Sequence, residues 1–309
     1  MAAHGIMFHY FHDQGLHIPA QGSISATKMN DILNYYQAQG YHLLNAKDWR
    51  EKALNHHLKD NQICITFDDG LKAQFEIAAS VLKARKLTAF YFIPTYFLSE
   101  DCRHNLEVYR HFRSSQFDNI EQFYQAFFKG LLQNQAQFSQ DLTQHLETFK
   151  TLDYLKEFPF YTDDDRRFRY IRDIALSERE YHWYMEMMMQ VHHYQPEKYY
   201  SLLWMSASDI KALDRDENII GLHSHHHPTN LQNYPYQYQY QDYSQNKNIL
   251  EDIIGHKISS VSYPCNSYNQ DTLQIMSQLG VDLGFRSNMQ SGFSSLLEIG
   301  RQDNANIPG

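Results

Sequence analysis

The chain has 309 residues, of which 42% are hydrophobic and 20% charged, a composition typical of a globular protein long enough to bury a sizeable core. It carries 27 basic and 36 acidic residues and a net charge of −9, which argues against nucleic acid or an anionic membrane as its partner. No apolar run approaches the length of about 18 residues that a membrane span needs.

The first hundred residues alternate predicted strands with predicted helices. Apolar runs that end in turn-forming residues predict strands at 5–12, 62–67 and 88–93. Between them apolar residues recur at helical spacing, and Gly40 ends the first helix. The stripe of that helix consists of Met29, Ile32, Leu33 and Tyr36. This alternation is typical of a parallel α/β sheet or barrel.

The alternation stops between about residues 99 and 203, where aromatic residues and glutamines recur at helical spacing. We interpret this region as a helical insertion in a single domain that spans residues 1–309. The alternation then resumes, with strands predicted at 218–222, 257–263 and 281–286. The tyrosine-rich stretch at 234–243 is predicted to be a loop.

The N-terminal sequence MAAHGIMFHYFHD lacks the basic start and continuous apolar core of a secretion signal. The cysteines Cys64, Cys102 and Cys265 are odd in number and scattered, which indicates reduced thiols. Both features predict a cytoplasmic protein.

Two groups of polar residues follow predicted strands. Asp68 and Asp69 precede Gly70, and the sequence HSHHHP occupies 223–228. The first group could be only a strand-ending turn, and the second only an exposed polar loop. However, parallel α/β folds bind ligands at the carboxyl ends of their strands. One carboxylate and two imidazoles would suit zinc or a similar divalent ion, and the spare carboxylate could act as a general base.

These two stretches, TFDDG at 66–70 and HSHHHP at 223–228, resemble the first two motifs of the polysaccharide deacetylase family, carbohydrate esterase family 4, with its NodB homology domain. The resemblance implies a distorted (β/α) barrel. It also implies that Asp68 is the catalytic base and that Asp69, His223 and His227 hold one divalent metal ion, for which Zn²⁺ is the expected identity. His226 lies three residues from His223 and competes with His227 as a ligand.

The stretch VSYPCNSYN at 261–269 occupies the place of the family's third motif, which supplies a backbone N–H as oxyanion donor. Tyr263 and Cys265 are the candidates for this donor. The motif's arginine, which orients the base, is missing, and Arg286 or Arg301 is expected to replace it. We also predict that both arginines and Asp303 bind substrate.

The family's final motif supplies a histidine as general acid, but residues 297–307 contain none, and Asn304 occupies its place. His9 or His12, on the first predicted strand, is the candidate replacement. Each could instead be a histidine packed within a strand.

The resemblance implies a metal-dependent carbohydrate N-deacetylase, a hydrolase of linear amide C–N bonds. Its substrate would be an N-acetylated sugar that is nucleotide-linked, lipid-linked or part of an oligosaccharide. The opening of the chain resembles the branch of the family associated with surface-polysaccharide biosynthesis, including O-antigen, lipopolysaccharide and capsule. Two alternatives stay open: a catalytically degenerate protein that binds glycan or a partner, and a hydrolase of another small amide.

Overall fold

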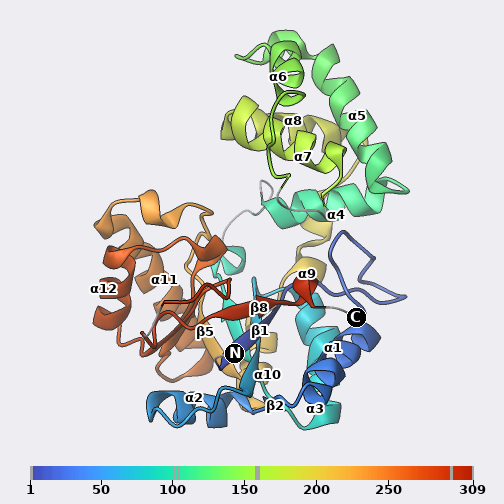
Figure 1. Cartoon of the computed structure of the whole chain (residues 1–309). Coiled ribbons are helices and arrows are strands. Elements are labelled where there is room, and N and C mark those ends of the chain that lie inside the picture. Colours follow the sequence, from blue (N-terminus) through green and yellow to red (C-terminus); the bar gives the residue numbers. More distant parts are fainter. Residues whose placement is uncertain (1–2, 100–101, 103–104, 157–160, 293–294, 308–309) are drawn as a thin grey trace. The chain divides into compact units, whose positions relative to one another are not determined.

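The computed structural model describes residues 3–99, 102, 105–156, 161–292 and 295–307 and divides the chain into two compact units. Met1–Asp101 and Ser201–Gly309 form the first, which we call the barrel unit. Cys102–Tyr200 form the second, which we call the helical unit (Figure 1).

The barrel unit is built on a sheet whose neighbouring strands all pair in parallel. The main path runs in the order β7-β6-β5-β4-β3-β1-β8, and the short β2 also pairs with β3. The strands are β1 (His4–Phe8), β2 (His42–Leu43), β3 (Gln62–Asp68), β4 (Phe90–Ile93), β5 (Ile219–Leu222), β6 (Ser260–Ser262), β7 (Leu283–Phe285) and β8 (Arg301–Asp303).

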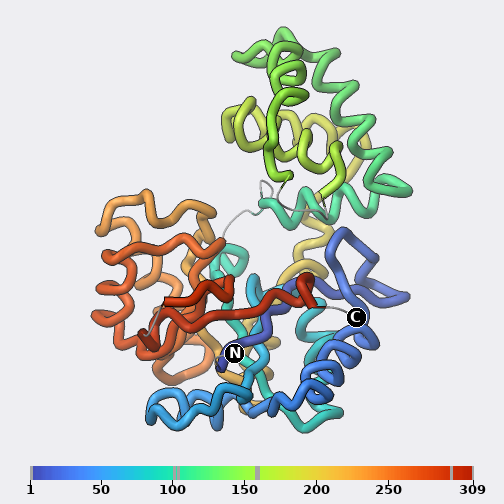
Figure 2. The backbone as a smooth tube through the Cα atoms, in the orientation of Figure 1, coloured from blue at the N-terminus to red at the C-terminus, as the bar shows by residue number. Residues whose placement is uncertain are grey.

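The sheet nearly closes on itself. Ile299 forms an isolated parallel bridge with Phe285 of β7, and two residues later the same segment becomes β8, which pairs with β1. One segment therefore contacts both ends of the sheet, and the predicted distorted (β/α) barrel is confirmed. The backbone path in Figure 2 shows this C-terminal segment crossing the barrel unit.

Helices surround this sheet because their apolar stripes need burial. The four residues predicted as the stripe of the first helix are the buried residues of α1. The helices of the barrel unit are α1 (Ala26–Ala38), α2 (Ala46–Leu54), α3 (Ala79–Arg85), α10 (Ala207–Arg215), α11 (Tyr236–Ile254) and α12 (Gln270–Gln278); α9 (Tyr200–Leu203) begins at the last residue of the helical unit. Short 3-10 turns lie at Tyr96–Leu98, Leu231–Asn233, Pro264–Asn266 and Asn304–Asn306, and a π-helical turn, η1 (Gln74–Ala78), precedes α3.

The prediction of a loop at 234–243 is wrong for all but its first two residues, because α11 begins at Tyr236. The buried face of the helix includes Gln239, Tyr243, Asn246 and Leu250, at spacings of four, three and four residues. Two of these four side chains are amides, so a search for apolar periodicity alone does not detect the helix.

The helical unit has an aromatic core. Its helices are α4 (Leu106–Gln116), α5 (Ile120–Gln133), α6 (Leu142–Phe149), α7 (Asp163–Tyr170) and α8 (Glu178–Val191), with a π-helical turn at Ile171–Ala175 and 3-10 turns at Gln135–Gln137 and Pro196–Lys198. Phe123 and Phe127 of α5 pack against Phe168 of α7, and the Arg113 guanidinium lies 5.2 Å from the Phe168 ring centre. Among the residues described in both units, no helix combines the length and apolarity needed to cross a membrane.

Candidate metal centre and active site

The carboxyl ends of β3 and β5 bring the two predicted motifs together. Strand β3 ends at Asp68, and Asp69 follows with a left-handed backbone of φ 77°. Strand β5 ends at Leu222, so His223 is the next residue, and His227 closes the following turn with φ 55°. Only β4 lies between these strands, and all three run in parallel, so their ends meet at one edge of the barrel.

Asp69, His223 and His227 form a compact group of three ligand atoms that all lie within 4.8 Å of one another. The two Nε2 atoms are 3.2 Å apart, and the Asp69 Oδ1 lies 3.4 Å from Nε2 of His223 and 3.2 Å from Nε2 of His227. Three tetrahedral ligands with metal bonds of about 2.0–2.1 Å would be separated by about 3.3 Å. The three donors thus have the spacing that one zinc-sized cation requires.

The hydrogen bonds of His223 determine which of its ring nitrogens can bind a cation. Its Nδ1 lies 2.8 Å from the backbone carbonyl oxygen of Ser262 and must donate a proton to it, because a carbonyl only accepts. In the neutral ring Nε2 then carries a lone pair that faces Asp69 and His227. A carbonyl that fixes a ligand imidazole in this way is usual around protein-bound metals. Burial disfavours the charged form of Asp69, but its close contacts with the two imidazoles outweigh burial and hold the pKa of Asp69 well below its ordinary value.

The other two histidines of the motif have different partners. His225 is fully buried, and its ring contacts the Thr95 hydroxyl at 2.7 Å. The His226 Nδ1 lies 2.6 Å from the Asp242 carboxylate of α11. The geometry therefore favours His227 over its competitor His226 as the second imidazole ligand.

Asp68 lies beside this group and is 3% exposed. Arg301 grips its carboxylate with two hydrogen bonds of 2.6 Å, and the Ser262 hydroxyl donates a third at 3.1 Å. Its Oδ2 lies 3.9 Å from Nε2 of His223. Burial works to raise the pKa of Asp68, but the charge and hydrogen bonds of Arg301, together with the charges of His223 and His9, outweigh it and the net pKa is lowered. Asp68 is thus held ionised next to the candidate metal ligands.

Arg301 reaches Asp68 by passing over Gly5 of β1. A Cβ atom at position 5 would lie 3.1 Å from Cγ of Arg301 and 3.1 Å from Cγ2 of Thr66. Of the two arginines expected to orient the base, the structure places Arg301 in that position. Its side chain is fully buried, so the expectation that it contacts substrate is not supported.

The two candidates for the general acid differ in position. Nε2 of His9 lies 3.9 Å from Oδ2 of Asp68, and a quarter of the His9 side chain is exposed (25%). The ring of His12 instead hydrogen-bonds the Ser23 hydroxyl at 2.8 Å in the loop that follows β1. Only His9, of these two, has an ion-pair contact with Asp68 within the described part of the chain.

Two further predicted residues, Tyr263 and Arg286, have structural roles in this fold. The Tyr263 backbone N–H donates to the carbonyl of Phe285 at 3.2 Å, so it cannot also be the oxyanion donor, and the Tyr263 side chain is 1% exposed. Arg286 is 3% exposed and donates hydrogen bonds to the Glu298 and Gln290 carbonyls. These bonds hold the segment before β8 in place.

The other two candidates lie in or beside 3-10 turns. Asp303 accepts a hydrogen bond from the Ala305 N–H at 2.8 Å and so caps the turn at Asn304–Asn306. Cys265, the alternative oxyanion donor, is exposed in the turn Pro264–Asn266, where its φ is 50°. The structure therefore gives Asp303 a capping role, and its contact with substrate stays a prediction.

Two residues of α11 that the sequence analysis missed hold the histidine segment in place. The Asn246 side chain accepts from the His223 backbone N–H and donates to the Ile93 carbonyl. Asp242 accepts from the backbone N–H groups of His225 and His226. A helical stripe that counted amides and carboxylates as well as apolar residues would have found both.

Gln74, in the π-helical turn η1, was also missed. Its Nε2 donates to the Asp68 carbonyl at 2.5 Å and to the His9 carbonyl at 2.9 Å. Pairing of β1 with β3 ends at Phe8 and Phe67. Gln74 therefore links the two strands one residue beyond their last backbone pair. The side chain is fully buried, and its Oε1 has no hydrogen-bond partner in the structure. Gln74 therefore fixes the spacing between His9 and Asp68.

Comparison of the sequence with known proteins gives a match over part of the chain. The family model for polysaccharide deacetylase matches residues 184–284, which include the histidine motif but not Asp68 and Asp69. No curated protein matches the chain in a sequence search.

Solved deacetylase structures match nearly the whole chain. The Streptococcus pyogenes deacetylase PplD aligns with 16% identity and a TM-score of 0.54, over 98% of this chain and 92% of that protein. IcaB from Ammonifex degensii aligns with 13% identity and a TM-score of 0.55, over 97% and 90%. A de-N-acetylase from Aggregatibacter actinomycetemcomitans aligns with 12% identity and a TM-score of 0.57, over 99% and 96%. At such identities these structures establish the fold, and with the family match over residues 184–284 they confirm the predicted resemblance to the polysaccharide deacetylase family.

Proposed function

We propose that this protein is a metal-dependent hydrolase that removes the N-acetyl group from an amino sugar. The observation that carries the proposal is the convergence of Asp69, His223 and His227 within 4.8 Å, with the ionised carboxylate of Asp68 beside them. The names of the structurally similar proteins, a deacetylase and a de-N-acetylase, support the same reaction class.

One divalent cation, proposed to be Zn²⁺, would be held by the Asp69 oxygen and the Nε2 atoms of His223 and His227. Two imidazoles and one carboxylate are a common ligand set of catalytic zinc, which keeps a further position open. When bound, such an ion polarises a carbonyl and makes water a stronger acid.

In the proposed reaction the amide C–N bond breaks, the acyl carbon gains the hydroxyl of water, and the amine nitrogen gains a proton. Asp68 is placed to take the proton from the attacking water, since Arg301 and Ser262 keep it ionised and oriented. His9 is partly exposed and 3.9 Å from Asp68, which suits it to give a proton to the departing amine. In this scheme His9 takes the role of the histidine that Asn304 replaces.

The proposed substrate is an N-acetylated sugar of a surface polysaccharide such as O-antigen, lipopolysaccharide or capsule. It would be presented as an oligosaccharide or linked to a nucleotide or lipid. A cytoplasmic location is part of the proposal, and it is supported by the odd number and scattered positions of the three cysteines.

The test combines metal analysis with acetate release. The wild-type protein should bind one equivalent of Zn²⁺ and release acetate from at least one N-acetylglucosamine substrate, supplied free, as an oligosaccharide, linked to uridine diphosphate or linked to a lipid. Asp68→Asn should keep the metal and lose activity by a factor of about 10² or more. Asp69→Asn should lose both. If Asp68→Asn lost the metal and Asp69→Asn kept it, the two aspartates would have the opposite roles.

The replacement of the motif histidine by Asn304 favours a second candidate function, a glycan-binding protein without catalysis. A stoichiometric metal content without acetate release from any of these substrates would support this alternative and refute the hydrolase. Acetate release by the wild-type protein that is lost in His9→Ala would refute the glycan-binding alternative.

A further inference from the structure

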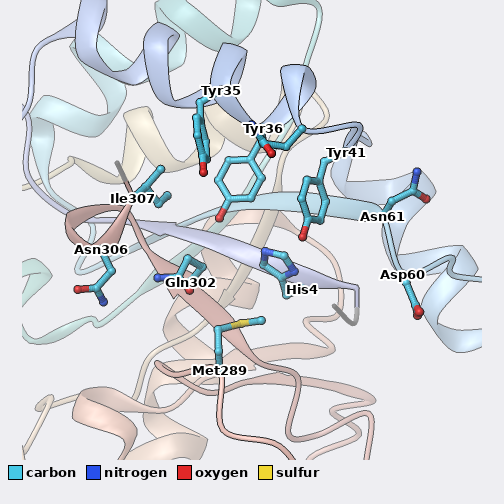
Figure 3. A pocket seen from close by; sticks show the side chains of 11 residues that line it. His4, Tyr35, Tyr36, Tyr41, Asp60, Asn61, Met289, Gln302, Asn306 and Ile307 are labelled. Atoms are coloured by element: carbon cyan, nitrogen blue, oxygen red, sulfur yellow. The ribbon is translucent and has the colours of Figure 1, made fainter. Parts of the chain in front are cut away.

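A pocket of about 410 Å³ lies on the outer face of the barrel unit, between α1, the start of β1 and β8 (Figure 3). Side chains alternate along a strand, so Gln302 faces outward into this pocket whereas its neighbour Arg301 faces inward to Asp68. His4, at the start of β1, lines the pocket, and His9 lies five residues further on. At about 3.3 Å per residue these two histidines are about 16 Å apart, so the pocket is separate from the candidate metal centre.

Tyrosines form one side of this pocket. Tyr35 and Tyr36 extend from α1 and Tyr41 from the segment after it, as Figure 3 shows. The His4 ring packs 6.0 Å from Tyr36 and 5.7 Å from Tyr41, which fixes those two rings, while Tyr35 stays 37% exposed. Met289 lies on the opposite side and is 36% exposed. The pocket thus presents apolar surface on two facing sides.

Ile307 also lines the pocket, and the remaining lining is polar and almost uncharged. It is supplied by Gln39, Asp60, Asn61, Gln302 and Asn306. The Asn61 amide is held by its hydrogen bond to the Gly40 carbonyl at 3.0 Å. Neither lysine nor arginine is among the described residues of the lining, so the pocket offers a phosphate group neither of these side-chain cations.

We propose that this pocket binds a neutral sugar unit of a glycan, at a site distinct from the metal centre. Aromatic rings pack against the C–H faces of a pyranose, and amides and a carboxylate exchange hydrogen bonds with its hydroxyl groups. A small-ligand site of this kind combines apolar walls with a few polar groups in a volume of roughly 300–1,000 Å³. The proposal goes beyond the hydrolase function, because binding here needs neither the metal nor the base.

Methionine-methyl NMR can test binding at this pocket. The probe is the β-1,4-linked trisaccharide of N-acetylglucosamine, added to ¹³C-methyl-methionine protein in the Asp68→Asn background so that turnover is slowed by a factor of about 10² or more. Met289 is identified by the resonance that disappears in Met289→Leu. We expect the Met289 methyl to shift with a Kd of about 1 mM, and Tyr35→Ala to weaken this binding at least about tenfold. Tyr234→Ala is the matched control, because Tyr234 is equally exposed at 37% but does not line the pocket.

Three outcomes would overturn the proposal. These are no shift of Met289 at about 20 mM trisaccharide, an undiminished shift in Tyr35→Ala, or a stronger response to uridine diphosphate than to the sugar. Because the chemical shift of the Met289 methyl group reports binding directly, the result does not depend on acetate release. In an otherwise wild-type protein, Tyr35→Ala should leave acetate release from a monosaccharide unchanged, which separates the two sites.

Discussion

Replacing Arg301 by methionine tests whether this arginine holds Asp68 ionised. Arg301 is fully buried and makes both of its 2.6 Å bonds to a carboxylate that is itself 3% exposed. Methionine keeps much of the aliphatic stem but leaves a buried charge without its partner. Breaking a buried pair in this way costs about 3–5 kcal/mol at neutral pH. The double variant Asp68→Asn/Arg301→Met leaves no unpaired charge and should be more stable than Arg301→Met by about 1–3 kcal/mol.

The destabilisation should depend on pH. In the wild type the pKa of Asp68 is lowered. Its ion pair with Arg301 therefore stabilises the folded state at any pH above the unfolded pKa of about 3.9, and this stabilisation is lost as the pH falls through the pKa of Asp68 in the folded state. Without the guanidinium, burial is the dominant influence and raises the pKa of Asp68. The folded variant then takes up a proton at mildly acid pH, and its stability deficit relative to wild type narrows as the pH falls from about 7 to about 4.

Urea unfolding with chelator present measures this effect without any bound cation. In a Trp183→Phe background the remaining tryptophans, Trp49 and Trp204, both lie in the barrel unit and report its unfolding alone. Arg286→Met is the matched control, since Arg286 is also buried, at 3%, but hydrogen-bonds carbonyls and an amide. A deficit for Arg301→Met that stays constant with pH, or that follows the control, would refute the reasoning.

Two further predictions concern the metal ligands and the positioning of the acid. His227→Ala removes a direct ligand and should weaken Zn²⁺ binding by more than the factor of about 10–100 that loss of an outer partner costs, measured in competition with a chromophoric chelator. His226→Ala should keep the Zn²⁺ affinity, because that ring binds Asp242, and equal losses in the two variants would contradict this assignment. Gln74→Leu should lower acetate release by a factor of about 10–100 with the metal content unchanged, since it frees the spacing between the ends of β1 and β3. Full activity in this variant would exclude a positioning role.

The sequence by itself determined the elements and motifs that depend on local pattern. The apolar stripe of α1 and the apolar runs of β3 and β4 are readable because burial imposes a period of 3.6 or a continuous apolar run on neighbouring residues. Asp68, Asp69 and the histidine segment were recognisable because each group follows such a strand directly. Parallel strands then bring these groups to one edge, which is why the metal-ligand group could be predicted from two short stretches.

Only the tertiary structure decided which of several equivalent residues takes each place. Arg286 and Arg301 are both buried arginines near the C-terminus, yet only Arg301 crosses over Gly5 to reach Asp68, because β8 pairs with β1. Helix α11 was hidden for the same reason, since its buried Asn246 is satisfied by groups more than twenty residues away in the chain. Local pattern records whether a residue is buried, but its partner is fixed by contacts between distant segments, and these exist only once the barrel has formed.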